Sequence, residues 1–199
     1  MAEATHPAHV EHYTSTGIDH RKILMWLFLG SECLFFGSLI ATYQVYRGQS
    51  LVGPHPHDVF NIPYTSISAF VLLMSSLTMA LAVNSIRLGN LPATRIWLLL
   101  TALQGSIFVG GQVFEFTTFV EHGLSLQVNL FGTTFFVLTG FHGAHVTVGI
   151  IMLFSLLFAS LLGKLTPAQA LTVEIVGLYW HFVDIVWIVI FTVVYLLPY

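Results

Sequence analysis

Apolar residues occur in five long runs along the chain, and short segments rich in polar and turn-forming residues separate them. An α-helix rises about 1.5 Å per residue, so about 20 apolar residues are needed to cross a hydrocarbon layer about 30 Å thick. Each run meets that length. We therefore predict five transmembrane helices, over residues 22–46, 64–88, 95–118, 131–162 and 172–197.

The connecting segments predict how these helices are arranged. The sequence RLGNLPATR, between the second and third runs, is short and contains glycine and proline, which favours a tight turn between antiparallel neighbours. No internal repeat is evident, so residues 22–199 are predicted to form one all-α membrane bundle. The polar tail, residues 1–21, contains histidines and no apolar core, which is unlike a cleavable signal peptide.

Composition agrees with this pattern. Hydrophobic residues make up 56% of the 199 residues, charged residues make up 8%, and the mean hydropathy is +0.84. Soluble domains carry about 25% charged residues, so these values are typical of an integral membrane protein. The formal net charge of -3 and the lack of a basic tract argue against nucleic acid as a partner. The single cysteine, Cys33, excludes a disulfide or a cysteine metal cluster within one copy.

Basic residues flank the predicted helices unevenly. Five of the six are expected on the same side of the membrane as the N-terminus, and one is expected on the other side. Because cytoplasmic loops carry more lysine and arginine than external loops, we predict that the N-terminus lies inside and the C-terminus outside. The five residues on the inner side are Arg21, Lys22, Arg87, Arg95 and Lys164, and the residue on the outer side is Arg47.

Five ionisable side chains fall inside the apolar runs at similar predicted depth. Counting helical rise places Glu32 and His181 about 15 Å from the inner ends of their helices. His142 and His145 are three residues apart and share a helix face, as do His181 and Asp184. Because ionisable groups in hydrocarbon are costly, each of these side chains requires a functional or structural reason.

These residue types permit several kinds of chemistry. Imidazole and carboxylate groups bind transition metals, and histidines on different helices bind heme, although no specific metal motif such as HEXXH is present. Chains of Glu, Asp and His also relay protons through membranes, but here they concentrate in a middle layer. In a structural interpretation, they form interhelical hydrogen bonds. The expected pairs are His181 with Asp184, and Glu32 with His142 or His145.

Three segments carry a resemblance to a known family. They are SECLFF at 31–36, TGFHGAHVTVG at 139–149 and YWHFVDIVW at 179–187. On these segments the chain resembles subunit III of the heme-copper terminal oxidases, the cytochrome c oxidase subunit 3 family, in its short five-helix form. The resemblance extends from the first predicted helix to the last, and the second and third segments are highly specific.

The resemblance implies a non-catalytic subunit of a proton-pumping aerobic respiratory oxidase, an oxidoreductase of the electron transport chain in the bacterial cytoplasmic membrane. In that family, subunit III has no catalytic residues, no metal and no redox centre. Heme and copper are expected in partner subunits I and II. Membrane lipids are expected to contact this chain, including bound phospholipid. The family's glutamate at the position of Glu32 is a buried carboxyl that reacts with a hydrophobic carbodiimide, which implies a lipid- or proton-linked site. The family's subunit III also supports the stability of subunit I and its proton uptake.

The electron donor, cytochrome c or quinol, is expected to engage other subunits. The three motifs favour a cytochrome c oxidase, whereas the five-helix length also fits a quinol oxidase. An accessory protein of a nitric oxide reductase would share the helix layout. A stand-alone membrane metalloprotein or a transporter would be a different class, and either would act without a heme-bearing partner.

Overall fold

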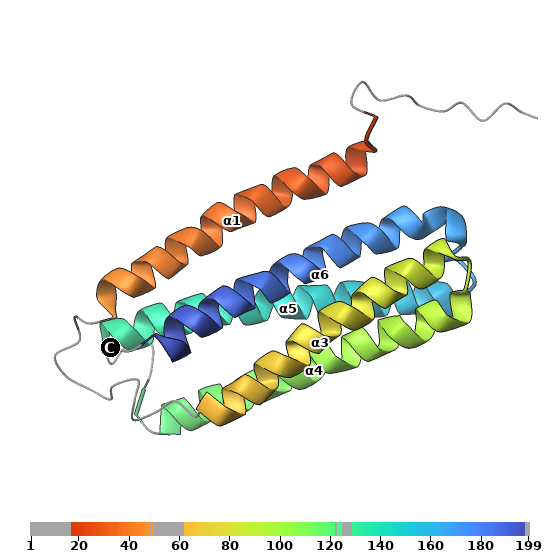
Figure 1. Ribbon diagram of the computed structural model, residues 1–199. Coiled ribbons are helices and arrows are strands. Elements are labelled where there is room, and N and C mark those ends of the chain that lie inside the picture. Colours follow the sequence, from red (N-terminus) through yellow and green to blue (C-terminus); the bar gives the residue numbers. More distant parts are fainter. Residues whose placement is uncertain (1–16, 48, 50–61, 122, 125–128, 198–199) are drawn as a thin grey trace, which may run out of the picture.

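The computed structural model describes residues 17–47, 49, 62–121, 123–124 and 129–197, and within them the chain is helical (Figure 1). Five helices there are long and apolar enough to cross a membrane. They are α1 (His20–Tyr46), α3 (Ile62–Arg87), α4 (Leu91–Glu121), α5 (Leu130–Leu161) and α6 (Ala170–Phe191), with a 3₁₀ turn η1 (Pro167–Gln169) before α6 and a π-helical turn η2 (Thr192–Leu196) after it. The predicted all-α fold with five membrane-length helices is confirmed.

The helix ends differ from the expected ranges by a few residues. The α-helix of α6 ends at Phe191 rather than near residue 197, because the π-helical turn η2 follows it, and α4 begins at Leu91 rather than near residue 95. The side chain of Asn90 accepts a hydrogen bond from the N–H of Ala93 at 3.2 Å, which caps the helix. Pro92 is tolerated there because N–H groups of the first turn have no partner within the helix. Of the predicted tail, residues 1–16 lie outside the described residues, and α1 already begins at His20.

Four of the helices form a bundle, and α1 is added to one side of it. Helix α3 packs beside α4 and α6, and α5 packs beside α4 and α6, while α1 contacts α5 and α6 (Figure 1). The buried residues of α1 are Leu29, Phe36 and Tyr43, which recur every seven residues on one face. Only 11% of the apolar part of α1 is buried, so most of its surface is available to lipid or to a partner.

Two glycines close turns at the same end of the bundle. Gly89 follows α3 with φ +74°, and Gly163 follows α5 with φ +69°. The N–H of Asn90 donates to the carbonyl of Ser85 at 2.9 Å, which satisfies a carbonyl at the end of α3. Glycine is favoured at both positions because side chains with a Cβ rarely adopt positive φ. This end also carries Arg21, Lys22, Arg87, Arg95 and Lys164, and we refer to it as the basic end.

The centre of the bundle is organised around Trp180 of α6, which is 1% exposed. Its Nε1–H donates to the hydroxyl of Ser75 on α3 at 2.9 Å. Its ring lies against Gly105 of α4 and Gly149 of α5, where a Cβ atom would approach the ring to 2.5 Å and 2.8 Å, respectively. The two glycines therefore let α4 and α5 approach α6 closely, as small residues do in membrane bundles.

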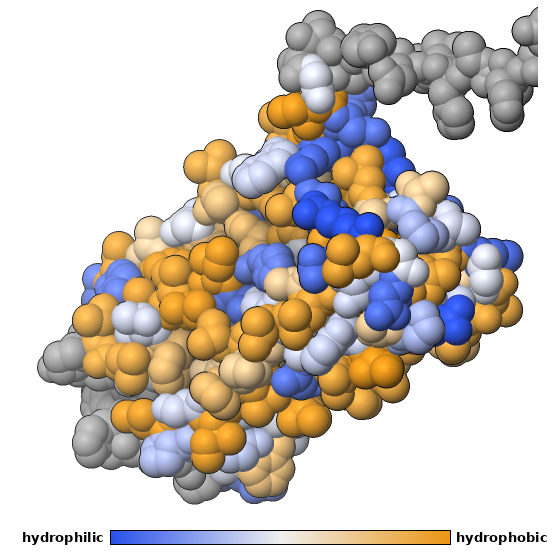
Figure 2. Space-filling view, turned by 45° about the vertical axis from the view of Figure 1, so that its right-hand side comes forward, coloured by the Kyte–Doolittle hydropathy of each residue, from blue (hydrophilic) through white to orange (hydrophobic). Residues whose placement is uncertain are grey.

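The surface is apolar over much of its area. Figure 2 shows hydrophobic side chains over most of the face in view, with strongly hydrophilic side chains near the start of α1. Leu34, Ile107 and Phe158, on three different helices, are each more than 60% exposed. Such exposure is costly in water and expected in hydrocarbon, so the surface is that of a membrane-embedded protein.

Candidate functional site

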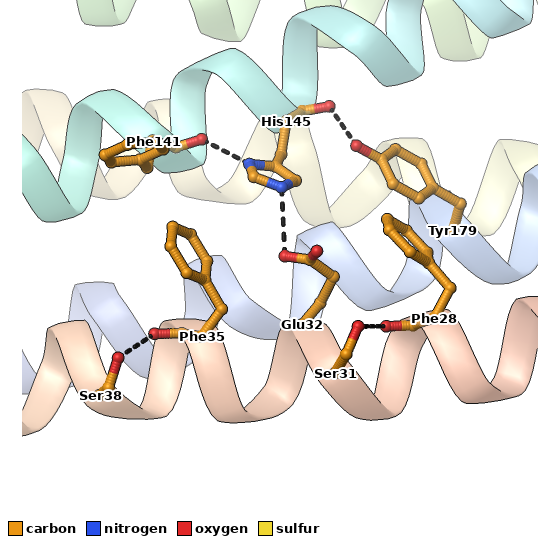
Figure 3. A network of polar contacts seen from close by, with 8 residues as sticks. All are labelled: Phe28, Ser31, Glu32, Phe35, Ser38, Phe141, His145 and Tyr179. Atoms are coloured by element: carbon orange, nitrogen blue, oxygen red, sulfur yellow. Dashed lines mark hydrogen bonds and ion pairs between the residues drawn. The ribbon is translucent and has the colours of Figure 1, made fainter.

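The midplane carboxyl of α1 lies against a histidine of α5. Glu32 projects from α1 toward His145, and its Oε2 lies 3.3 Å from His145 Nε2 (Figure 3). Both side chains are largely buried, with exposed fractions of 16% and 20%. The two atoms are at ion-pair distance but are not aligned for a hydrogen bond. Glu32 and His145 therefore form a polar contact between α1 and the bundle.

The other nitrogen of His145 determines its tautomer. Nδ1 lies 2.7 Å from the carbonyl oxygen of Phe141, one turn earlier on α5. Because a carbonyl accepts and cannot donate, Nδ1 carries the hydrogen. Nε2 is therefore the nitrogen that faces the Glu32 carboxyl.

Aromatic rings enclose this pair. The ring of Phe36 meets that of His145 edge-on at 5.0 Å between centroids, and Phe35 lies at 6.2 Å. The hydroxyl of Tyr179 on α6 donates to the carbonyl oxygen of His145 at 3.0 Å (Figure 3). Helix α6 therefore also contacts the Glu32–His145 pair. The pair therefore sits where α1, α5 and α6 meet, and apolar rings limit the approach of water to it.

His142 has different neighbours from His145, although both lie on α5. It is fully buried, and its Nε2–H donates to the carbonyl oxygen of Val183 on α6 at 3.1 Å. Its ring stacks on Trp187 at 4.9 Å and meets Phe108 of α4 edge-on at 5.9 Å. Its Nδ1 has no hydrogen-bond partner. His142 therefore joins α5 to α6, and Glu32 contacts His145 instead.

His181 and Asp184 are connected through a third residue. The hydroxyl of Ser76 on α3 donates to Asp184 Oδ2 at 2.6 Å, and His181 Nδ1 lies 3.1 Å from the same hydroxyl oxygen. Because Ser76 uses its hydrogen toward Asp184, Nδ1 of His181 is the donor to Ser76. Asp184 is 3% exposed, and its Oδ1 has no hydrogen-bond partner. The arrangement is a chain of donors from His181 through Ser76 to Asp184.

Two further carboxyls, outside the five predicted site residues, also form contacts between helices. Glu174 of α6 binds Lys22 of α1 and Arg87 of α3, each at 2.5 Å, and so connects three helices at the basic end. Glu115 of α4 is 7% exposed and accepts a hydrogen bond from the Thr65 hydroxyl of α3 at 2.6 Å. A signal for Glu174 was present, since an acidic residue at the start of the last helix faces an end rich in basic residues.

These groups do not gather into one centre. Among the residues that the structure describes, no three His, Cys, Asp or Glu side chains lie close enough to hold a metal ion. The five predicted site residues instead divide into Glu32 with His145, His142 with the Val183 carbonyl, and His181 with Ser76 and Asp184. Each group joins different helices at the middle of the bundle.

Comparison with known proteins decides the family. The family model for "Cytochrome c oxidase subunit III" matches residues 1–199. The chain belongs to the cytochrome c oxidase subunit III family. Among its relatives, "Quinol oxidase subunit 3" of Bacillus subtilis is 40% identical over 191 residues, which cover 96% of this chain and 93% of the relative. "Cytochrome c oxidase subunit 3" of Bacillus sp. strain PS3 is 33% identical over 197 residues, covering 99% and 95%. "Cytochrome bo(3) ubiquinol oxidase subunit 3" of Pseudomonas putida is 37% identical over 172 residues, covering 86% and 83%.

Membership in the subunit III family confirms the resemblance found in the three sequence segments and the prediction of a multi-pass bacterial membrane protein. The chain is subunit III of a heme-copper oxidase, and its activity is that of the complex. The relatives include quinol oxidases and cytochrome c oxidases alike, so the family is common to both kinds of donor.

Proposed function

We propose that this chain is the non-catalytic subunit III of a proton-pumping aerobic terminal oxidase, and that it supports the heme-copper subunit rather than reacting with oxygen itself. The observation that carries the proposal is the family match over residues 1–199. The division of the buried polar side chains into separate interhelical contacts supports it, because such contacts stabilise a bundle without forming a reaction centre. Subunits I and II and membrane lipids are its proposed partners, and phospholipid its proposed bound ligand.

A supporting role predicts a specific pattern when the chain is removed. The remaining complex should keep the heme absorption spectrum of the intact oxidase, because the cofactors belong to partner subunits. Oxygen consumption should begin but decline faster during turnover than in the intact complex, and adding the chain back should restore its lifetime. Loss of a heme band on removal of the chain would contradict the non-catalytic role.

The proposed electron donor is cytochrome c, on the basis of the SECLFF and TGFHGAHVTVG segments. Quinol is the second candidate, because the relative that is 40% identical is named a quinol oxidase. The two are separated by supplying the purified complex with reduced cytochrome c or with a reduced quinol and measuring oxygen uptake. Turnover with quinol but not with cytochrome c would overturn our proposal for the donor and leave the subunit III assignment unaffected.

The proposed orientation places the basic end in the cytoplasm, because its five basic residues exceed the single arginine at the opposite end of the helices. Arg47, at that opposite end, donates to the carbonyl oxygens of Val193 and Leu197. A protease, or a thiol reagent directed at a cysteine introduced into the N-terminal tail, is applied from one side of sealed vesicles to test the orientation. Reaction of the N-terminal tail from the outer side would contradict it.

The proposed role of Glu32 is to hold α1 on the bundle and to share a proton with His145. Glu32→Gln keeps the shape and provides an amide N–H that can donate to His145 Nε2, so we expect normal assembly and most of the oxygen uptake. The measurement is subunit content and oxygen uptake of the purified variant complex. Complete loss of activity with normal assembly would show instead that Glu32 is an obligatory proton carrier.

A further inference from the structure

A groove lined by both polar and apolar side chains runs along the bundle between α3 and α6. Its volume is about 300 Å³, and its lining includes Asn84 and Arg87 of α3 with Glu174, Gly177 and His181 of α6. Arg87 and Glu174 belong to the basic end, whereas His181 lies seven residues further along α6, or about 10 Å deeper. The groove therefore reaches from the basic end to a histidine near the middle of the membrane-spanning region.

The polar path continues beyond the inner end of the groove. His181 donates through Nδ1 to Ser76, and Ser76 donates to Asp184 Oδ2. Nδ1 is used in the hydrogen bond to Ser76. Nε2 is therefore the nitrogen of His181 that can bind a molecule in the groove. Asp184 is 3% exposed and has one oxygen without a hydrogen-bond partner. A carboxyl placed so deeply is costly unless protons can reach it.

Water is the occupant that fits this groove. A water molecule needs about 30 Å³ and two to four polar partners, so the groove has room for several of them. Asn84, Arg87, Glu174 and His181 supply polar partners for water among the apolar lining residues. An acyl chain would satisfy the apolar wall formed by Val83 and Leu178 but would leave His181 Nε2 without a hydrogen bond.

We propose that this groove is a water-filled inlet from the basic end, and that His181 and Ser76 pass a proton from its water to Asp184. In one passage, water protonates His181 at Nε2, the proton on Nδ1 moves to the Ser76 oxygen, and the Ser76 proton moves to Asp184 Oδ2. Asp184 changes from carboxylate to carboxylic acid, Ser76 keeps one proton, and His181 is left as the other neutral tautomer. The reverse sequence releases the proton and restores the first tautomer. The inference goes beyond the proposed function, because it holds whichever donor the complex uses.

The charged groups around the path come from four helices. Lys22 of α1 and Arg87 of α3 bind Glu174 at the mouth, which leaves a formal charge of +1 there. Such a mouth opposes the entry of metal cations, whereas protons travel along water by rearrangement of hydrogen bonds. On α5, His142 binds the carbonyl of Val183, the residue before Asp184. The Glu32–His145 pair lies on the other side of α6, near Tyr179.

Accessibility to water is tested first, in the whole complex with Cys33 replaced by serine. His181→Cys lies at the inner end of the groove, and Leu103→Cys is the control. Leu103 is 45% exposed on the apolar surface of α4, at a similar number of residues from the basic end. A charged, water-soluble thiosulfonate should label the cysteine at 181 at least about ten-fold faster than the cysteine at 103, because the reaction needs a hydrated thiolate. Equal rates would overturn the inlet and indicate lipid in the groove.

Proton arrival is tested by infrared difference spectroscopy of the complex after a drop in pH. After the drop in pH, the wild-type complex should show a new carbonyl band of a protonated carboxylic acid. The band should be absent from Asp184→Asn and present in Glu32→Gln. Ser76→Ala should form the band at least about ten-fold more slowly, since positioned proton transfer contributes a factor of this order or more, and Ser76→Thr should restore the rate. Recovery of the tagged variant chain with the heme-bearing subunit, in the same ratio as for wild type, identifies assembled variants. A band that persists in Asp184→Asn, or an unchanged rate in Ser76→Ala, would refute the path.

Discussion

Replacing Gly105 with alanine places a methyl group against the most enclosed ring of the bundle. The added Cβ atom would lie 2.5 Å from Trp180 Cη2 and 3.2 Å from Ile150 Cγ1. Trp180 cannot move away freely, because it is 1% exposed and its Nε1–H is bound to Ser75. Overpacking of this kind costs about 1–3 kcal/mol of folding free energy.

A matched control separates this steric cost from helix propensity. Gly110 is exposed on the same helix, and a Cβ atom there would meet nothing within 4 Å. Alanine favours a helix over glycine by about 0.5–1 kcal/mol, and this gain applies to both positions. Gly105→Ala should therefore be about 1–3 kcal/mol less stable than Gly110→Ala, the difference being the cost of overpacking.

The assay is detergent-denaturant unfolding of the purified chain, followed by tryptophan fluorescence and circular dichroism. Combining Gly105→Ala with Trp180→Phe should recover part of the loss, because the smaller ring removes the atom nearest to the new methyl group. If Gly105→Ala proves as stable as Gly110→Ala, the described packing of α4 against α6 is wrong.

Further predictions concern the polar contacts. Glu174→Gln should lower stability by about 1 kcal/mol at low salt, because it weakens two partly exposed ion pairs, and the loss should shrink at high salt. Glu121→Gln, at the exposed end of α4, is the control, and an equal effect would refute a specific role for Glu174. Thr65→Val should cost about 1–3 kcal/mol, because the buried Glu115 carboxyl loses a donor at 2.6 Å. Thr117→Val, whose hydroxyl donates to its own helix, should cost less in the same unfolding assay, and the opposite order would count against the Glu115 contact.

The fold was predictable because its determinants are local in sequence. A long apolar run has few stable alternatives to a helix within a membrane, and the turn after α3 is marked by Gly89, whose positive φ glycine allows. Counting residues from the ends of the apolar runs also predicted that the five polar residues lie near the middle of their helices. Family membership was likewise detectable, since the three motifs lie within single helices and depend on no tertiary contact.

The sequence left open which histidine Glu32 contacts, because that choice depends on how each helix is rotated. Three residues turn an α-helix by about 300°, so His142 and His145 point about 60° apart. That difference is enough for His142 to bind the Val183 carbonyl on α6 while His145 faces Glu32 on α1. Ser76 was not predicted as the link between His181 and Asp184, because serine is common in membrane helices and its position carries no specific signal.

Purification through a tag on this chain tests the central claim most directly. We expect a larger heme-bearing subunit to be recovered with it, and an optical spectrum of the complex that shows reduced heme bands in a fixed ratio to the tagged chain. After dissociation, the heme should remain with the partner, and the tagged chain should carry neither heme nor stoichiometric metal. Recovery of the chain without any heme protein, or of heme bound to the chain itself, would contradict its assignment as a supporting subunit of a heme-copper oxidase.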